Sequence, residues 1–169
     1  MRTVHLLIVP FLLAFLPPAL AADPPPPCGA PQHRQFDFWI GEWDVRTPDG
    51  KRAGTNRITG ILGGCGLQEN WTGAGGTTGT SLNTYDATRG LWHQTWIDSS
   101  GSVLLLEGSF RDGRMVLEGV TRPARGATTH DRITWEPLVG GDVRQVWEQS
   151  SDGGTSWTVV FDGRYTRRR

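Results

Sequence analysis

The sequence has no excess of either charge and few cysteines. Its 17 basic and 17 acidic residues cancel, so it lacks the net positive charge typical of nucleic-acid-binding proteins. Its two cysteines, Cys28 and Cys65, do not form a C-x-x-C motif, which argues against a thiol–disulfide oxidoreductase. No apolar run after residue 21 is long enough to span a membrane. We therefore expect neither a nucleic-acid partner nor stable membrane insertion.

Motifs that mark catalytic or metal centres are also missing. The histidines after residue 21, His33, His93 and His130, stand far apart, and there is no H-x-H or H-E-x-x-H motif. No G-x-S-x-G motif marks a nucleophilic serine. The glycine-rich stretch 73–80 lacks the lysine of a phosphate-binding loop, so we interpret it as a hairpin or lid. We predict no metal site, no cofactor and no identified catalytic residue.

The sequence has little helical character. Its 23 glycines are too densely scattered for long helices, and no long segment shows helical periodicity. Short runs rich in Val, Thr, Trp and Ile alternate instead with clusters of Gly, Asp and Ser. The predicted strands are 42–47, 51–60, 65–72, 77–86, 90–98, 102–111, 113–121, 127–137, 141–149 and 155–167. This pattern predicts an all-β fold, an antiparallel up-and-down β-barrel of about ten strands.

Local motifs refine this prediction. Asp112-Gly113 between two strands indicates a type I′ hairpin turn. The segment 31–40 is expected to form a short helical turn that lays Phe36, Phe38 and Trp39 against an apolar surface. Closing the barrel would remove the exposed edges of the sheet.

Alternation assigns side chains to faces of the strands. Trp92, Gln94 and Trp96 share one face of their strand, and His93 lies on the other. The last strand places a longer set on one face: Trp157, Val159, Phe161, Gly163 and Tyr165. Four polar residues are expected on the same barrel faces as the tryptophans: Glu69, Gln94, Arg132 and Gln145. If these faces point inward, the lumen is aromatic and amphipathic.

The N-terminus predicts export. Residues 1–21 have a basic start, an apolar run and a small-x-small cleavage site, which together indicate a secretory signal peptide. Residues 22–35 contain four consecutive prolines and are expected to form a spacer before a barrel domain at 36–169. The predicted location is periplasmic or secreted. An oxidising compartment favours a Cys28–Cys65 disulfide, with two free thiols as the alternative.

The stretch SSDGGTSW at 150–157 resembles the Asp-box of sialidases and related β-propellers. The chain holds one such motif and is too short for a propeller of four-stranded blades. Asp152 can accept hydrogen bonds from backbone N–H groups of the turn, and Trp157 can pack under it. We interpret the motif as a structural hairpin.

A second resemblance covers essentially the whole mature chain. It rests on HRQFDFWIGEWDV, Gly64-Cys65, the ENW at 69–71, YDATRGLWHQTWIDSSG and WEQSSDGGTSWTVVFDGRYTR. Together these are similar to the bacterial DUF1579 family, which is grouped with the calycins. The resemblance implies a lipocalin-like barrel with an internal cavity, and it implies no activity. Gly41-x-Trp43 also resembles the Gly-x-Trp of lipocalins, whose tryptophan is covered by a late arginine, here Arg164 or Arg167.

We therefore expect an exported barrel that binds a small apolar or amphipathic ligand. The predicted ligand-binding residues are Glu69, Trp71, Tyr85, Trp92, Gln94 and Trp96. Several alternatives stay open. The cavity could serve an enzyme with Glu69 or His93 as acid or base, or hold haem through His93 or His130 as in nitrobindin barrels. The barrel could also have a solid core and outward tryptophans that dock a partner. A monomer or a small homo-oligomer is expected.

Overall fold

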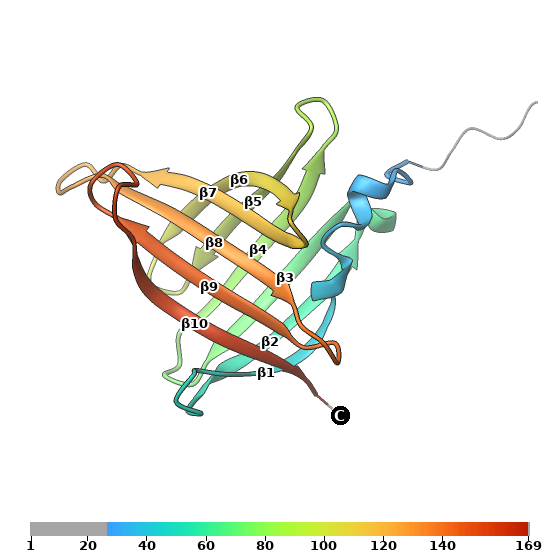
Figure 1. Ribbon diagram of the computed structural model, residues 1–169, viewed down its shortest axis with the longest axis horizontal. Coiled ribbons are helices and arrows are strands. Elements are labelled where there is room, and N and C mark those ends of the chain that lie inside the picture. Colours follow the sequence, from blue (N-terminus) through green and yellow to red (C-terminus); the bar gives the residue numbers. More distant parts are fainter. Residues whose placement is uncertain (1–26, 169) are drawn as a thin grey trace, which may run out of the picture.

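Ten antiparallel strands form a closed barrel in the computed structural model, which describes residues 27–168 (Figure 1). Each strand pairs with its neighbours in the chain, and β1 pairs with β10 to close the barrel. The strands are β1 Gly41–Arg46, β2 Arg52–Ile61, β3 Gly66–Gly73, β4 Thr78–Asp86, β5 Leu91–Asp98, β6 Val103–Arg111, β7 Arg114–Thr121, β8 Thr129–Pro137, β9 Val143–Ser150 and β10 Thr158–Arg167. The predicted all-β, up-and-down barrel of ten strands is confirmed.

The predicted hairpin at Asp112-Gly113 is present between β6 and β7. Both residues have positive φ angles, 50° at Asp112 and 76° at Gly113, as a type I′ turn requires. Glycine and aspartate tolerate this region better than other residues do, so the dipeptide itself selects the turn. The turn fixes the register of β6 against β7, in which Arg111 lies opposite Arg114.

The alternation predicted for the last strand is wrong at its start. The register of β10 against β9 shifts between Val159 and Phe161, which marks a β-bulge. An extra residue in one strand inverts the alternation beyond it. Phe161, Gly163 and Tyr165 consequently face the interior, whereas the Val159 side chain is 54% exposed.

One end of the barrel is closed by the segment before β1, at the right of Figure 1. This segment contains two short 3-10 helices, η1 (Pro31–Arg34) and η2 (Asp37–Trp39). Phe36 and Trp39 are fully buried and stack on each other with ring centroids 5.0 Å apart. Phe36 also contacts Trp92 and Trp135 edge-on, and Phe38 packs on Phe110. The expected helical turn therefore exists and plugs the barrel.

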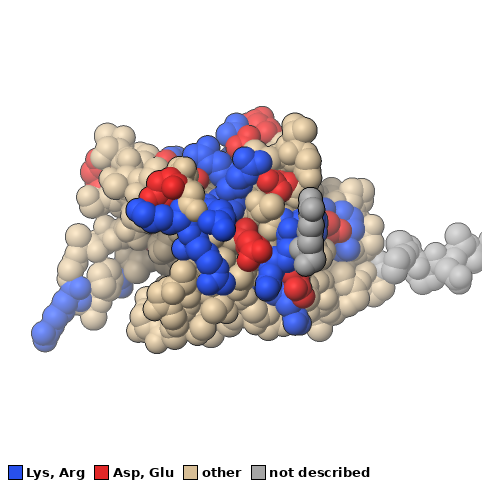
Figure 2. Space-filling model, turned by 90° about the horizontal axis from the view of Figure 1, so that it is seen from below, with Lys and Arg blue, Asp and Glu red and all other residues tan. Residues whose placement is uncertain are grey.

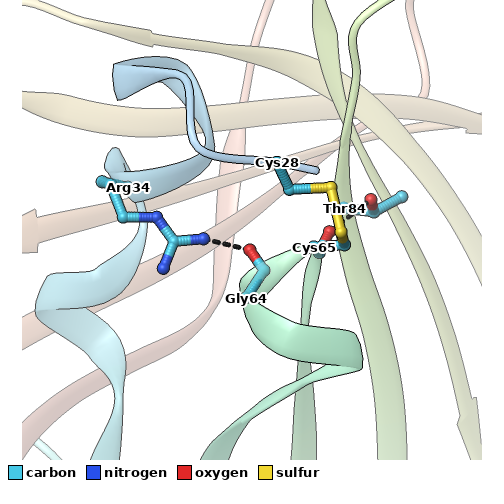
Figure 3. Close-up of a disulfide and its surroundings, with 5 residues drawn as sticks. All are labelled: Cys28, Arg34, Gly64, Cys65 and Thr84. Carbon is cyan, nitrogen blue, oxygen red and sulfur yellow. Dashed lines mark hydrogen bonds between the residues drawn. A yellow bond between two sulfur atoms is a disulfide. The ribbon is translucent and has the colours of Figure 1, made fainter. Parts of the chain in front are cut away.

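The disulfide ties this plug to the barrel, as predicted. Cys28 is bonded to Cys65, which lies between the 3-10 helix η3 (Leu62–Gly64) and β3 (Figure 3). Arg34 donates a hydrogen bond to the Gly64 carbonyl beside it, and the Thr84 hydroxyl donates to the Cys65 carbonyl at 2.8 Å.

Two residues of the predicted spacer at 22–35 pack against the barrel. His33 is buried with its ring against Tyr85, and the Gln35 side chain accepts a hydrogen bond from the Trp92 indole at 3.2 Å. Packing therefore begins in η1, before the residue 36 that the sequence suggested as the start of the domain. Cys28 anchors the chain directly before this packed region.

An arginine covers the tryptophan that opens β1. The Arg167 guanidinium lies 4.5 Å from the Trp43 ring centroid, and the Trp43 indole N–H bonds the Trp39 carbonyl at 2.9 Å. A Cβ atom at Gly41 would be 2.5 Å from the Arg167 guanidinium and 3.3 Å from the Trp43 ring, so the glycine leaves room for this contact. Of the two arginines considered, Arg167 makes the contact, and Arg164 pairs with Asp142 instead.

The predicted signal peptide, residues 1–21, lies outside the described residues. Within residues 27–168, no helix has the length and apolar character needed to cross a membrane.

Candidate functional site

The barrel contains a cavity of about 220 Å³ in the half opposite the plug. Its walls are mainly aromatic and aliphatic, and a few polar side chains reach it from different strands. The lining residues are Glu69, Trp71, Gln94, Trp96, Leu104, Ile133, Trp135, Gln145, Trp147, Val160, Phe161 and Tyr165. Such an apolar pocket with a few convergent polar groups is the usual form of a small-molecule site.

The structure brings four of the six predicted ligand residues together. Glu69, Trp71, Gln94 and Trp96 all line the cavity. Tyr85 and Trp92 also face the interior but lie at the other end, opposite each other on β4 and β5. The plug covers them, because His33 packs on Tyr85 and Gln35 bonds the Trp92 indole. These two residues therefore belong to the closed end.

Aromatic rings surround the mouth side of the cavity. Trp71 and Phe161 meet edge-to-face with centroids 6.1 Å apart. The Trp147 indole N–H donates to the Asp131 carboxylate at 2.9 Å, which fixes this ring in place. Trp96 lies across from Leu104 in the register of β5 and β6. The stretch 73–80 supplies the β3–β4 hairpin beside them, at the mouth end.

The polar part of the cavity is a connected network centred on Glu69. Asn56 donates to one carboxylate oxygen of Glu69 at 2.7 Å, and the Ser81 hydroxyl donates to the other at 2.6 Å. Behind them, Gln94 donates to Asn83 at 2.7 Å, and Asn83 donates to Ser81 at 2.9 Å. The hydrogen bonds therefore run in one direction, from Gln94 through Asn83 and Ser81 to the Glu69 carboxylate.

The environment of Glu69 changes its acidity. Burial raises the pKa of this carboxyl from 4.5 to about 7, although the hydrogen bonds from Ser81 and Asn56 lower it. The Tyr165 hydroxyl is also buried and donates to Gln145. Burial and the neighbouring charge of Glu69 raise the pKa of this phenol well above its ordinary value. At neutral pH, Glu69 is the group of this pair that can change charge.

The two histidines considered for catalysis or haem binding lie outside the aromatic cavity. His93 is on the outer face of β5, where its ring bonds Thr95 at 2.8 Å and Glu107 at 3.3 Å. His130 lines a separate surface cavity with Glu118 and Trp157. The residues around the aromatic cavity include no histidine. They therefore do not fit a histidine-ligated haem, and His93 cannot act on a molecule inside this cavity.

Most charged side chains lie on the outside of the barrel. Figure 2 shows basic and acidic side chains interleaved on the face seen from below. Arg144 on β9 pairs with Asp162 on β10 at 2.7 Å, and Arg164 on β10 pairs with Asp142, just before β9, at 2.9 Å. Arg132, which was expected on the tryptophan face, pairs instead with Glu148 and stacks on Trp157 at 4.0 Å. That expectation was wrong, because Arg132 lies between the interior residues Asp131 and Ile133 on β8.

The tryptophans do not form an outer docking patch. Trp157 lies outside the barrel under Arg132, and the other seven of the eight tryptophans belong to the core, plug or cavity. The exposed apolar residues on β4, β5 and β6 are aliphatic, namely Leu82, Ile97, Val103 and Leu105. The structure therefore differs from the alternative of a solid barrel whose outward tryptophans dock a partner.

The Asp-box stretch forms the β9–β10 hairpin, as interpreted from the sequence. The Asp152 carboxylate accepts hydrogen bonds from the Ser156 hydroxyl at 2.6 Å and from the backbone N–H groups of Thr155 and Ser156. The Ser156 hydroxyl contributes most to lowering the pKa of this carboxyl. The Trp157 indole N–H bonds the Gly154 carbonyl at 3.0 Å. All these contacts stay within the hairpin.

Several residues of the site were not among the six predicted ligand-binding residues. They include Trp147, Phe161 and Tyr165 from the last two strands, and the Glu69 partners Asn56 and Ser81. Alternation placed Phe161 and Tyr165 on one face of the last strand, but it could not place them opposite Glu69. Among residues 27–168, no three His, Cys, Asp or Glu side chains are grouped so that they could hold a metal ion.

No protein-family model matches this sequence, and no curated protein matches it. The resemblance to DUF1579 therefore stays a prediction.

Proposed function

We propose that this protein is an exported barrel that binds one small amphipathic molecule in the aromatic cavity. The observation that carries the proposal is the position of Glu69, a buried carboxylate that lines an otherwise largely apolar cavity. The tryptophans would bury the apolar part of the ligand, and Glu69 with Gln94 and Gln145 would orient its polar head.

The size of the cavity limits the ligand. An apolar cavity of about 150 Å³ in another protein accommodates benzene. The present cavity, at about 220 Å³, has room for a single-ring compound with a short polar substituent or for a short acyl chain. Larger molecules would have to extend past Trp71 and Phe161 at the mouth.

Binding is favoured over catalysis by the arrangement around Glu69. Its pKa of about 7 would suit a general acid or base. However, both of its oxygens accept hydrogen bonds from fixed partners, and the other lining residues are aromatic, aliphatic or amide side chains. If the protein is an enzyme, Glu69→Gln should abolish turnover without unfolding the chain.

Export is part of the same proposal. The Cys28–Cys65 disulfide supports it, since disulfides persist mainly in oxidising compartments. Intact mass measurement of the protein purified from its native host should give a chain that starts at Ala22. Native mass spectrometry of the same sample should show a discrete added mass if the ligand is retained on purification.

Isothermal titration calorimetry with small aromatic and acyl compounds would test the site itself. Trp96→Ala should weaken binding at least about tenfold, because a large ring leaves the cavity wall. Trp157→Ala removes a tryptophan from the outside and is the matched control. Unchanged affinity in a folded Trp96→Ala variant would exclude this cavity as the binding site.

A further inference from the structure

The barrel interior holds two buried carboxyl groups without a positively charged partner. Glu69 and Asp131 are both buried, with 5% and 1% of their surfaces exposed, and no lysine or arginine is among the buried residues of the described chain. The ion pairs formed by residues 27–168 include neither carboxylate. Buried charges in proteins are normally paired or bound to a cation.

The two carboxylates differ in how many hydrogen bonds they accept. Asp131 accepts three, from Trp147 and Gln149 at 2.9 Å each and from Thr121 at 3.0 Å. Glu69 accepts two side-chain hydrogen bonds, one on each oxygen, although a carboxylate has about four acceptor positions. Asp131 is thus well satisfied, and Glu69 retains acceptor capacity next to the cavity.

The groups around Glu69 offer few further donors. The Tyr165 hydroxyl gives its hydrogen to Gln145, and the Ser81 hydroxyl already bonds Glu69. The Oδ1 atom of Asn56 is buried and has no hydrogen-bond partner among the described residues. The Trp135 indole N–H is buried in the same way and also lacks a partner among the described residues. Among the residues that line the cavity, Glu69 alone has a carboxylate, and none has a basic side chain.

The walls of the cavity add a second feature that favours positive charge. Four aromatic residues, Trp71, Trp96, Trp147 and Phe161, line the mouth side, and the negative faces of such rings attract cations. Aromatic rings combined with an acidic group form the usual surroundings of a bound ammonium group.

We propose that the ligand of this cavity carries a protonated amine, which binds the Glu69 carboxylate while its apolar part contacts the tryptophans. This inference rests on the proposed small-molecule function and specifies its ligand class. A molecule with an anionic head is disfavoured, because it would face Glu69 without a compensating cation.

The inference makes binding depend on pH in a defined direction. Alkyl amines stay protonated through the neutral range, so the charge of Glu69 decides the affinity. The other titratable group facing Glu69 is Tyr165 on β10, whose pKa is raised and which stays neutral. The side chains that the neighbouring strands turn toward Glu69 do not titrate: they are Asn56 on β2, Ser81 on β4, Gln94 on β5 and Gln145 on β9. Asp131 on β8 accepts its hydrogen bond from the wall residue Trp147. Affinity for an amine should therefore rise with pH until Glu69 is ionised.

Three probes of similar size would test this: 2-phenylethylamine, 2-phenylethanol and phenylacetate. By calorimetry near pH 8 we expect the amine to bind at least about tenfold more tightly than the alcohol. Between about pH 8 and pH 5.5, affinity for the amine should fall about thirtyfold, as expected for a carboxyl with a pKa of about 7. Affinity for the alcohol should stay constant.

Variants separate the roles of the groups. Glu69→Gln should remove both the preference for the amine and its pH dependence, and Glu42→Gln, on the outer face of β1, should keep both. If the alcohol binds as tightly as the amine, or if Glu69→Gln keeps the preference, the ammonium inference is wrong and the binding cavity stands. If none of the three compounds binds, the small-ligand function itself fails. The pH profile of the unmodified protein gives the same decision without relying on a variant.

Discussion

The indole of Trp96 lies directly against Gly79, so that a Cβ atom on residue 79 would be 2.3 Å from the ring. Trp71 lies against Gly54 in the same way, with a corresponding distance of 2.7 Å. Each pair joins neighbouring strands, and each glycine leaves space at the wall for a large ring. The tryptophans therefore lie along the wall, and the lumen between them stays open as the cavity.

Gly79→Ala tests this relationship. The new methyl group would push Trp96 into the cavity, so we expect affinity for any cavity ligand to fall at least about tenfold. Gly75→Ala in the adjacent hairpin is a suitable control, because nothing lies within 4 Å of the position that its methyl group would occupy. Calorimetry on both variants gives the comparison, and equal affinities would mean that Gly79 does not shape the site.

Glu69 should make stability depend on pH. Its pKa is about 7 in the folded chain against an ordinary 4.5, so the folded state holds the proton more tightly. Stability from this group is fully present below about pH 4.5 and is lost as pH rises through 7, by up to roughly 3 kcal/mol. Urea denaturation near pH 5 and near pH 8 measures this loss.

Glu69→Gln provides the control for that measurement. The variant should fold, because Asn56 can turn its free Oδ1 atom toward the new amide. It should also lack the loss of stability between these pH values. The same pH dependence in both proteins would assign it to groups other than Glu69.

The Cys28–Cys65 disulfide should stabilise the closed end of the barrel. It closes a loop across a sequence separation of 37 residues and holds η1 against the barrel. Replacing both cysteines with serine should lower the free energy of unfolding by about 2–4 kcal/mol. Equilibrium denaturation of the oxidised protein and the double variant measures the difference, and identical midpoints would show that the plug needs no covalent tie.

Asp152 should contribute to the stability of the β9–β10 hairpin and not to ligand binding in the cavity. Asp152→Ala removes the acceptor for the hydrogen bonds of Thr155 and Ser156, so we expect the melting temperature to fall. Ligand affinity should stay unchanged, because the contacts of this carboxylate are within the hairpin. Thermal denaturation and calorimetry on one preparation address both points, and a loss of affinity in the folded variant would contradict a purely structural role.

The strands and turns could be predicted because their signals are local. Every predicted strand overlaps an observed one, and Asp112-Gly113 forms the expected turn. The face of the strand on which a side chain lies was predictable where alternation is regular, as for Trp92, Gln94 and Trp96 on β5. It failed at Val159, because a bulge depends on how β10 meets β9 and leaves no clear mark in the sequence.

The class of fold and the residues available to line a cavity follow from the sequence alone, which also favoured the Cys28–Cys65 disulfide without excluding free thiols. Which of these residues meet depends on the packing of the whole barrel. Alternation assigns a side chain to the inside of a barrel but does not give its depth along the axis. Depth follows from the register of all ten strands and from the plug, which buries Tyr85 and Trp92 and leaves Glu69 and Trp96 at the cavity. The Glu69 network likewise joins residues 12 and 13 positions apart, which only the pairing of β2, β3 and β4 brings into contact.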